Sequence, residues 1–318
     1  MTHQQTSQLT PGGDGGIKRA RLARHGVLSV SGADARAFLH AQLTNDVEHL
    51  GTDAARLAGW CSAKGRLLAN FAVVPRTDGF LLVAARDLAA AIAKRLTMFV
   101  LRSKVKIADE SDGWTATGVW GAGARARLAA LGLAPGEAPL AVAAAGGRIA
   151  VRVDADRFLL LAAAGEATAL EARIGGQEAL EDDWSLLEIR SGRVLITQAT
   201  QDQFVPQMVA LDAIGGVDFK KGCYPGQEVV ARTQYRGQLK RRIVRARVPA
   251  GLEVRPGQDL YSDDAAGEAS GTVVNVAPAA GGSEFLAVAP IAAVEEHKPI
   301  RTAPGGAQIE VLALPYSQ

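Results

Sequence analysis

Residues 26–43 have the sequence GVLSVSGADARAFLHAQL, and this stretch carries the signals that decide the fold. Its apolar alternation predicts a strand over residues 26–31, and the small and acidic residues at 32–34 then open a helix. The apolar residues of that helix share one face: Ala35, Phe38, Leu39 and Leu43. The stretch therefore predicts a strand followed by a helix with one buried side.

The same pattern occurs a second time further along the chain. VSGADAR at residues 30–36 resembles VWGAGAR at 119–125, and FLLVAA at 80–85 resembles FLLLAA at 158–163. Two matches in the same order predict two copies of one α+β unit, each an antiparallel sheet backed by helices. The alternative is a chance resemblance between alanine-rich segments.

After Arg242 the sequence changes character. Val244, Ala246 and Val248 alternate with arginines, which predicts a strand. Short apolar segments then follow, separated by turn signals such as Pro256-Gly257. This spacing predicts a small antiparallel β-barrel.

Together these patterns predict an α+β protein with four regions. We expect a disordered tail over residues 1–16, a first α+β domain over 17–112, a second over 113–238 and the barrel over 239–318, with the first two domains able to interleave. Two helix starts are also predicted. They are a cap by Asp87 on a helix that ends near Phe99, and a cap by Asp182 and Asp183 on a short helix over 184–191.

Composition excludes several classes of protein. The chain has 318 residues and 48% hydrophobic content, enough for two or three packed domains. The net charge of +2 gives no bulk basic field, which argues against direct nucleic-acid binding. No segment approaches the ~20 apolar residues that cross a bilayer, and the polar N-terminus lacks a signal peptide. We expect no membrane association and a cytoplasmic location.

The two cysteines, Cys61 and Cys223, argue against a disulfide framework and against a resident iron–sulfur cluster, which takes about four thiolates. The five histidines show no paired metal-ligand spacing, so no stably bound metal is expected. We interpret Cys61 as structural.

Residues 219–232, FKKGCYPGQEVVAR, concentrate the reactive side chains of the chain. Glycines and a proline predict a tight turn, and the valines at 229–230 the start of a buried element. Adjacent lysines favour the thiolate form of Cys223. The alternative is a surface turn with an incidental cysteine.

The signature K-G-C-Y-x-G-Q-E followed by V-A-R resembles that of the YgfZ family, which is related to the T-protein of the glycine cleavage system. Further similar stretches occur at residues 26–47, 63–71 (AKGRLLANF), 204–224 and 314–317 (LPYS). The resemblance implies two related α+β domains and a C-terminal β-barrel around a central folate cavity. It also implies a tetrahydrofolate-binding accessory protein that supports iron–sulfur enzymes, including a tRNA-modifying one.

The resemblance further implies the site residues and partners. Cys223 is the functional thiol, and the partners are a small-molecule folate and iron–sulfur client proteins or assembly factors. The residues expected to contact folate are Trp184, His25, Arg190, Gln207, Tyr224, Gln227, Glu228 and Arg232. The loop itself is formed with Lys220, Lys221, Gly222 and Gly226. Instead of binding a ligand, Trp184 could be an ordinary core residue, and Arg232 could lie on a solvated surface.

Three departures separate this chain from its apparent relatives. Relatives tend to carry glutamate at the position of Arg190, and some carry tryptophan at that of His25. The T-protein, an aminomethyltransferase, carries an aspartate pair where this chain has Ala69 and Asn70. Because neither residue is an acid or base at neutral pH, aminomethyl transfer is the second hypothesis. A third hypothesis is an interaction module whose cavity binds no ligand.

Overall fold

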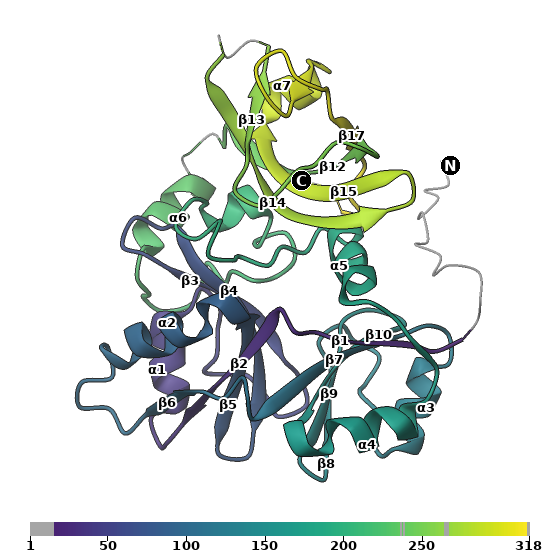
Figure 1. Cartoon of the computed structure of the whole chain (residues 1–318). Coiled ribbons are helices and arrows are strands. Elements are labelled where there is room, and N and C mark those ends of the chain that lie inside the picture. The colour runs from purple at the N-terminus through teal and green to yellow at the C-terminus, as the bar shows by residue number, and fades with distance from the viewer. Residues whose placement is uncertain (1–15, 236, 238, 264–266, 317–318) are drawn as a thin grey trace, which may run out of the picture.

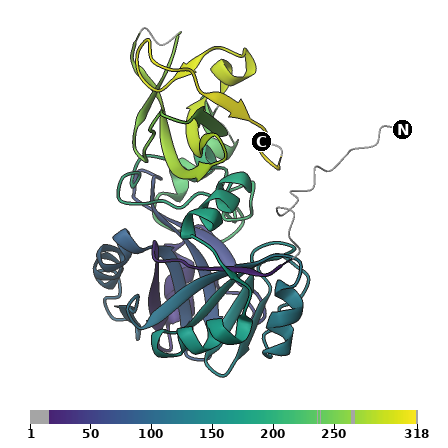
Figure 2. The same ribbon diagram turned by 45° about the vertical axis from the view of Figure 1, so that its right-hand side comes forward.

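The computed structural model describes residues 16–235, 237, 239–263 and 267–316. The expected tail falls almost wholly on residues 1–15, which lie outside this description. The two α+β units lie at one end of the molecule and the C-terminal sheet at the other (Figures 1 and 2).

The first unit is a five-stranded antiparallel sheet with strand order β3-β4-β5-β2-β6. Two helices, α1 and α2, belong to it (Figure 1). The elements are β2 (His25–Ser31), α1 (Ala35–Gln42), β3 (Arg56–Cys61), β4 (Leu67–Arg76), β5 (Gly79–Ala85), α2 (Arg86–Thr97) and β6 (Lys106–Asp109).

The second unit is a six-stranded sheet with strand order β11-β1-β7-β10-β9-β8 and two helices, α3 and α4. Its first strand comes from the N-terminus, ahead of the first unit (Figure 1). The elements are β1 (Lys18–Arg21), β7 (Trp114–Trp120), α3 (Ala124–Ala130), β8 (Val142–Ala145), β9 (Arg148–Arg152), β10 (Arg157–Ala163), α4 (Ala164–Ile174) and β11 (Gln177–Glu178).

The predicted duplication is confirmed by the element order. Each unit runs strand, helix, three strands, helix, strand, and the matched sequence segments occupy equivalent places in both. The difference lies at one edge. In the first unit β2 pairs directly with β6, whereas in the second unit β1 separates β7 from β11 and pairs with both. The N-terminal strand therefore belongs to the second sheet, and the two domains interleave.

The two sheets pack face to face, and their helices lie on the outer faces. Along β5, Phe80 and Leu82 join the core shared with α1 and α2, whereas Leu81 and Val83 join the core between the sheets. This alternation follows from the two-residue period of a strand. Strand β10 alternates in the same way, with Leu159 and Leu161 between the sheets and Phe158 and Leu160 under α3 and α4. Burial on both faces explains why these strands are almost uniformly apolar.

Both predicted helix caps need correction. Helix α2 begins at Arg86, so Asp87 lies in its first turn, and its carboxylate accepts the backbone N–H of Gln198 at 3.0 Å instead. Helix α5 (Glu181–Arg190) begins three residues earlier than predicted. The carboxylate of Asp183 accepts the N–H of Leu180 at 3.0 Å, so it closes the helix start from inside the first turn.

The C-terminal region forms one curved six-stranded antiparallel sheet, a half-barrel with strand order β16-β13-β14-β15-β12-β17. One face of this sheet has a core of its own, whereas Ile243, Val274 and Leu286 on the other face join the core of the first unit. Tyr316, in the terminal LPYS stretch, donates to the carbonyl of Gly192 at 2.8 Å and ties this end of the chain to the end of α5. The elements are β12 (Arg241–Pro249), β13 (Asp259–Ser262), β14 (Ala269–Ala279), β15 (Gly282–Pro290), α7 (Ile291–Glu295), β16 (Ile300–Arg301) and β17 (Glu310–Leu312).

A connecting segment between the second unit and the half-barrel contains α5, the short 3-10 helix η1 (Pro206–Val209) and α6 (Gln227–Tyr235). Helix α5 packs against β14 and β15 of the half-barrel and against β1. The chain thereby brings all three regions together around one point. Within the described residues, no helix is long and apolar enough to cross a membrane.

Candidate functional site

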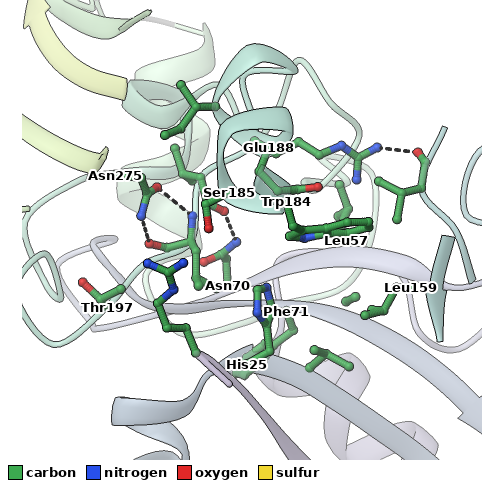
Figure 3. Close-up of a pocket in the computed structure, with 18 of the residues that line it drawn as sticks. His25, Leu57, Asn70, Phe71, Leu159, Trp184, Ser185, Glu188, Thr197 and Asn275 are labelled. Atoms are coloured by element: carbon green, nitrogen blue, oxygen red, sulfur yellow. Dashed lines mark hydrogen bonds between the residues drawn. The ribbon is translucent and has the colours of Figure 1, made fainter. Parts of the chain in front are cut away.

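A cavity of about 560 Å³ lies where the two sheets, helix α5 and strand β14 meet (Figure 3). A volume of this size suits a ligand as large as a typical cofactor. Both α+β units contribute apolar side chains to its wall, namely Leu57, Phe71, Val83, Leu140, Val151 and Leu159. The cavity therefore exists only once all three regions have packed.

Two asparagines hold the segment that closes one side of the cavity. Asn70 of β4 donates to the carbonyl of Val194 at 2.8 Å and accepts the N–H of Ile196 at 2.8 Å. Asn275 of β14 accepts the N–H of Leu195 at 2.9 Å and donates to its carbonyl at 2.8 Å (Figure 3). Each side chain must donate and accept at once, which an amide can do and a carboxylate cannot.

A carboxylate from α5 lines the cavity and is held by a buried arginine. Glu188 accepts a hydrogen bond from Nη1 of Arg157 at 2.9 Å. The Arg157 side chain is only 7% exposed, and its guanidinium also lies 5.4 Å from the ring centre of Trp184. One cation thus fixes both an acceptor and an aromatic wall of the cavity.

Trp184 has both of the roles that the sequence left open for it. It is 2% exposed, and its ring packs against that of Trp120 with centroids 5.9 Å apart. A Cβ atom at Gly118 would lie 2.3 Å from Trp184 Cε3, so glycine is required there for the indole to fit. Trp184 also lines the cavity (Figure 3), so it is a core residue that presents ring surface to a ligand.

His25 lines the cavity at the start of β2. Its Nδ1 atom is buried without a hydrogen-bond partner and lies 3.6 Å from Oε1 of Glu181. Burial tends to raise the pKa of Glu181, but the contact with His25 and the N–H of Arg24 lower it overall. Nδ1 therefore faces Glu181, which does not line the cavity, and it is the imidazole ring that contributes to the wall.

Arg190 is directed away from the cavity. Its guanidinium pairs with the carboxylate of Glu284 on β15, with an Nη2–Oε1 distance of 2.6 Å, and Arg190 does not line the cavity wall. Glu284 is only 11% exposed and also lies 3.9 Å from Arg245. The ion pair joins α5 to the half-barrel, so the expected ligand contact by Arg190 is replaced by a link between two regions.

Residues 219–226, which we call the signature loop, lie against α1 and the β3–β4 hairpin. Lys221 donates through Nζ to the carbonyls of His40 and Leu43, the latter at 2.8 Å, at the C-terminal end of α1. The same ammonium lies 4.9 Å from the ring centre of Tyr224. Carbonyls at a helix C-terminus carry partial negative charge, so Lys221 anchors the loop there.

The loop also depends on a close backbone approach. Gly226 has φ +79°, and a Cβ atom there would lie 2.4 Å from the carbonyl oxygen of Ser62 and 2.7 Å from Cα of Gly65. Nε2 of Gln227 lies 3.4 Å from the carbonyls of Lys221 and Gly222 and closes the turn. The predicted tight turn is present, and the helix that follows begins at Gln227.

The two cysteines are in opposite environments. Cys223 is exposed, whereas Cys61 is 2% exposed in strand β3. Burial raises the pKa of the Cys61 thiol to about 12. Cys223 therefore sits on the surface of the signature loop, where a second molecule can reach it, and it does not line the cavity. Among the described residues, no group of three or more histidine, cysteine, aspartate or glutamate side chains can hold a metal ion.

The remaining expected contacts also lie outside the cavity wall. Gln207 is buried and donates to the carbonyl of Val230 at 2.8 Å, which joins η1 to α6. Tyr224 is buried under the loop, and burial raises its pKa. Lys220, Glu228 and Arg232 are exposed. Of the residues expected to contact folate, the structure brings only His25 and Trp184 to the cavity, because α6 turns its side chains toward solvent and η1.

Sequence reasoning missed the polar wall residues Glu188, Ser185 and Asn275. Glu188 precedes Arg190 by two residues, so a carboxylate in the same short helix was the available signal. Asn275 lies in an ordinary strand of the half-barrel, about 200 residues from Asn70, and no sequence spacing relates the two.

Comparisons with known proteins agree with this architecture. Residues 22–137 match the family model of the GCVT N-terminal domain. The crystal structure of glycine cleavage system aminomethyltransferase T from Bartonella henselae has a similar fold, with a TM-score of 0.75 at 20% identity over 95% of this chain and 86% of that one.

Curated relatives are closer in sequence. The tRNA-modifying protein YgfZ of Serratia proteamaculans is 31% identical over 299 residues, which cover 92% of this chain and 90% of that protein. The protein of the same name from Edwardsiella ictaluri is 35% identical over 238 residues, 73% of this chain and 72% of its own length. Identity at this level and coverage, together with the shared fold, shows that the chain belongs to the YgfZ family.

Proposed function

We propose that this protein binds a reduced folate in the central cavity and acts in the cytoplasm as an accessory protein for iron–sulfur enzymes, including tRNA-modifying ones. Cys223 is the group that it presents to those clients. The observation that carries the folate assignment is the cavity wall, where Trp184 and Glu188 are fixed side by side by Arg157.

The donor set of the cavity fits tetrahydrofolate. A pterin ring needs an aromatic or apolar wall and an acceptor for its amino and ring N–H groups, which Trp184 and Glu188 supply. The imidazole ring of His25 adds to the aromatic surface of the wall. The glutamate tail needs cations, and Arg24, Arg86 and Arg193 line the same cavity. Arg24 already pairs with Asp182 and Arg86 with Asp112, so Arg193 is the best placed of the three. When bound there, the folate would supply one-carbon chemistry, or its binding would report how much folate the cell contains.

The thiol has a separate role in this proposal. Cys223 lies on an exposed loop that is anchored by Lys221 and does not line the cavity. An exposed thiol can bind iron transiently, or its thiolate can attack the outer sulfur of a partner's persulfide, so that the partner's thiolate leaves and the persulfide is now on Cys223. The chain therefore serves iron–sulfur enzymes through a surface contact and holds no cluster of its own.

Aminomethyl transfer is the second candidate, and the geometry weighs against it. Asn70 uses both its donor and its acceptor on the backbone of residues 194 and 196. Ala69 is buried in the sheet and has no titratable group. The T-protein carries an aspartate pair at these two positions, whereas neither Ala69 nor Asn70 can transfer a proton.

Calorimetric titration with tetrahydrofolate tests the ligand. We expect saturable binding that weakens about tenfold or more in Glu188→Gln, since a charged acceptor is lost. Quenching of tryptophan fluorescence should disappear in Trp184→Phe. Glu178→Gln, at an 85% exposed glutamate outside the cavity, is the matched control and should bind like the wild type. Absence of wild-type binding would leave only the interaction-module hypothesis.

A complementation assay tests the thiol independently. In a strain that lacks its own YgfZ, Cys223→Ala should fail to restore iron–sulfur enzyme activity and tRNA modification, while the purified variant binds folate normally. Cys61→Ser serves as the matched control because Cys61 is buried. Full rescue by Cys223→Ala would reject the role of this thiol, and turnover of a methylamine donor by the wild type would support the transferase.

A further inference from the structure

The turn between α2 and β6 exposes three large apolar side chains. Met98, Phe99 and Leu101 are 63%, 44% and 89% exposed. Among the described residues they make up half of the six large apolar side chains that are exposed, and they fall within four positions. The turn lies at the side of the first unit (Figure 1). Contiguous exposed apolar surface of this kind marks an interaction site.

This turn is held in one conformation by its backbone and by the core beneath it. Leu101 has φ +47°, a left-handed conformation that is unfavourable for leucine and points to an imposed geometry. The N–H of Ser103 donates to Val100 at 2.8 Å, and the N–H of Lys104 donates to the carboxylate of Asp34 at 2.7 Å. Val100 packs against the core of the first unit. The apolar surface is therefore preformed.

Basic residues lie close in sequence to the apolar side chains. Five basic residues flank them, and none forms an ion pair within the part of the chain that the structure describes: Lys94, Arg95, Arg102, Lys104 and Lys106. The arginine at the other end of the same helix behaves differently, because Arg86 pairs with Asp112. Arg95 lies over the ring of Trp60 at 5.6 Å, which holds its charge at the surface. The turn thus joins apolar area to uncompensated positive charge.

We infer that residues 94–106, which we call the basic turn, form a docking surface for an acidic protein whose apolar pocket is rimmed by carboxylates. Such a pocket would bury Leu101 and Phe99 and pair with the flanking cations. RNA fits less well because Phe99 is the only aromatic residue in this range, and methionine and leucine give bases no stacking platform.

A membrane surface also fits less well. Amphipathic helices that lie on membranes keep a long apolar face free. In α2 that face, with Leu88, Ile92 and Leu96, is already buried in the first unit. Only the turn remains available, and none of its residues lines the cavity, so a protein docked here leaves the ligand site unfilled.

Fluorescence anisotropy of the full chain with defined probes tests this inference. The probe is a labelled helical peptide with a stripe of leucine and phenylalanine that is flanked on both sides by glutamates. We expect saturable binding that weakens with added salt and falls about tenfold in the triple variant Met98→Ser, Phe99→Ser, Leu101→Ser. The matched control is the double variant Leu180→Ser, Val311→Ser, at exposed apolar residues elsewhere, which should bind normally.

Charge reversal tests how much the basic side chains contribute to binding of the peptide. Arg102→Glu combined with Lys104→Glu should weaken binding about tenfold or more, whereas Arg127→Glu combined with Arg173→Glu, at exposed arginines of the second unit, should not. Equal loss in test and control pairs would reject the surface. Each variant is first checked for a native unfolding transition, so that loss of fold is not mistaken for loss of binding.

A photoreactive residue at position 101 identifies the natural occupant in cells. We expect cross-links to a mapped, carboxylate-rich segment of a protein, which should be lost after Arg102→Glu and Lys104→Glu. Cross-links to lipid or RNA, or wild-type-specific binding to anionic phospholipid vesicles or an RNA hairpin, would overturn the inference in favour of those partners.

Discussion

The central cavity and the signature loop solve different structural problems. The cavity is assembled from all three regions of the chain, has mainly apolar walls and fixes its few polar groups through Arg157, Asn70 and Asn275. The signature loop is local, exposed and held by a lysine on a helix end and by glycine contacts. The cavity is enclosed by packed side chains, whereas the thiol of the loop is open to solvent.

This separation has a functional consequence. Because Cys223 does not line the cavity, a ligand can occupy the cavity without covering the thiol. The two places are nevertheless linked through the chain between them, since Leu211 and Ile214 line the cavity and Gln207 bonds to Val230 of α6. The comparison therefore predicts two separable activities on one connected segment.

The largest expected effect separates the two thiols. With Cys223 exposed and Cys61 buried with its pKa raised to about 12, iodoacetamide should modify Cys223 at least about 100-fold faster in the native protein. Mass spectrometry should find one adduct on the folded chain and two after unfolding. Equal modification of both thiols in the folded protein would contradict the contrast between surface and core.

A substitution at Gly226 should have the next largest effect. Gly226→Val places a β-branched residue at φ +79° and against the backbone of Ser62 and Gly65, and we expect a loss of about 3 kcal/mol or more in unfolding free energy. Gly305→Val is the control, because its φ is +65° but nothing lies within 4 Å of its added Cβ. Chemical denaturation checks both variants, and equal losses would mean that the close approach is unimportant.

Asn70→Asp tests the cavity side of the comparison. An aspartate cannot donate to the carbonyl of Val194, so we expect a loss of about 1–3 kcal/mol in unfolding free energy and weaker folate binding. Gln203→Glu, which removes an exposed bond to the carbonyl of Ala199, should change little. A stable Asn70→Asp protein that gained transferase activity would revive the second hypothesis.

The smallest expected effect is a pH dependence at Lys221. Burial lowers its pKa from 10.5 to about 8, against the attraction of Asp46, Asp218 and Cys223. The unfolded chain therefore holds this proton up to a higher pH than the folded protein does. The contribution of Lys221 to stability should rise between about pH 8 and about pH 10.

The measurement for Lys221 is a difference between two proteins. The unfolding free energy of wild type minus that of Lys221→Met should increase from about pH 7 to about pH 9.5. Cys61 titrates in both proteins, so its contribution cancels in this difference. Lys220→Met, at an exposed lysine, is the control and should show no such trend. A flat difference would mean that Lys221 keeps its proton in the folded state.

Several elements could be predicted because their signals are local. The matched segments at 30–36 and 119–125 end the first strand of each unit and begin its helix, as the repeat predicted. The alternation around Val244 and Val248 correctly indicated strand β12. Helix starts were less accurate, because Asp87 and Asp183 lie inside the first turn, where Asp87 bonds to Gln198 far along the chain and Asp183 to the N–H of Leu180.

The sequence by itself determined the duplicated α+β units, the β-rich end, the tight turn at Gly226 and the family, since side-chain periodicity and contiguous motifs are properties of neighbouring residues. Tertiary structure alone decided that β1 enters the second sheet, that Arg190 pairs with Glu284, and that Glu188 lines the cavity while Cys223 does not. These outcomes depend on which distant surfaces meet, and burial and hydrogen bonding between residues far apart in the chain set that choice.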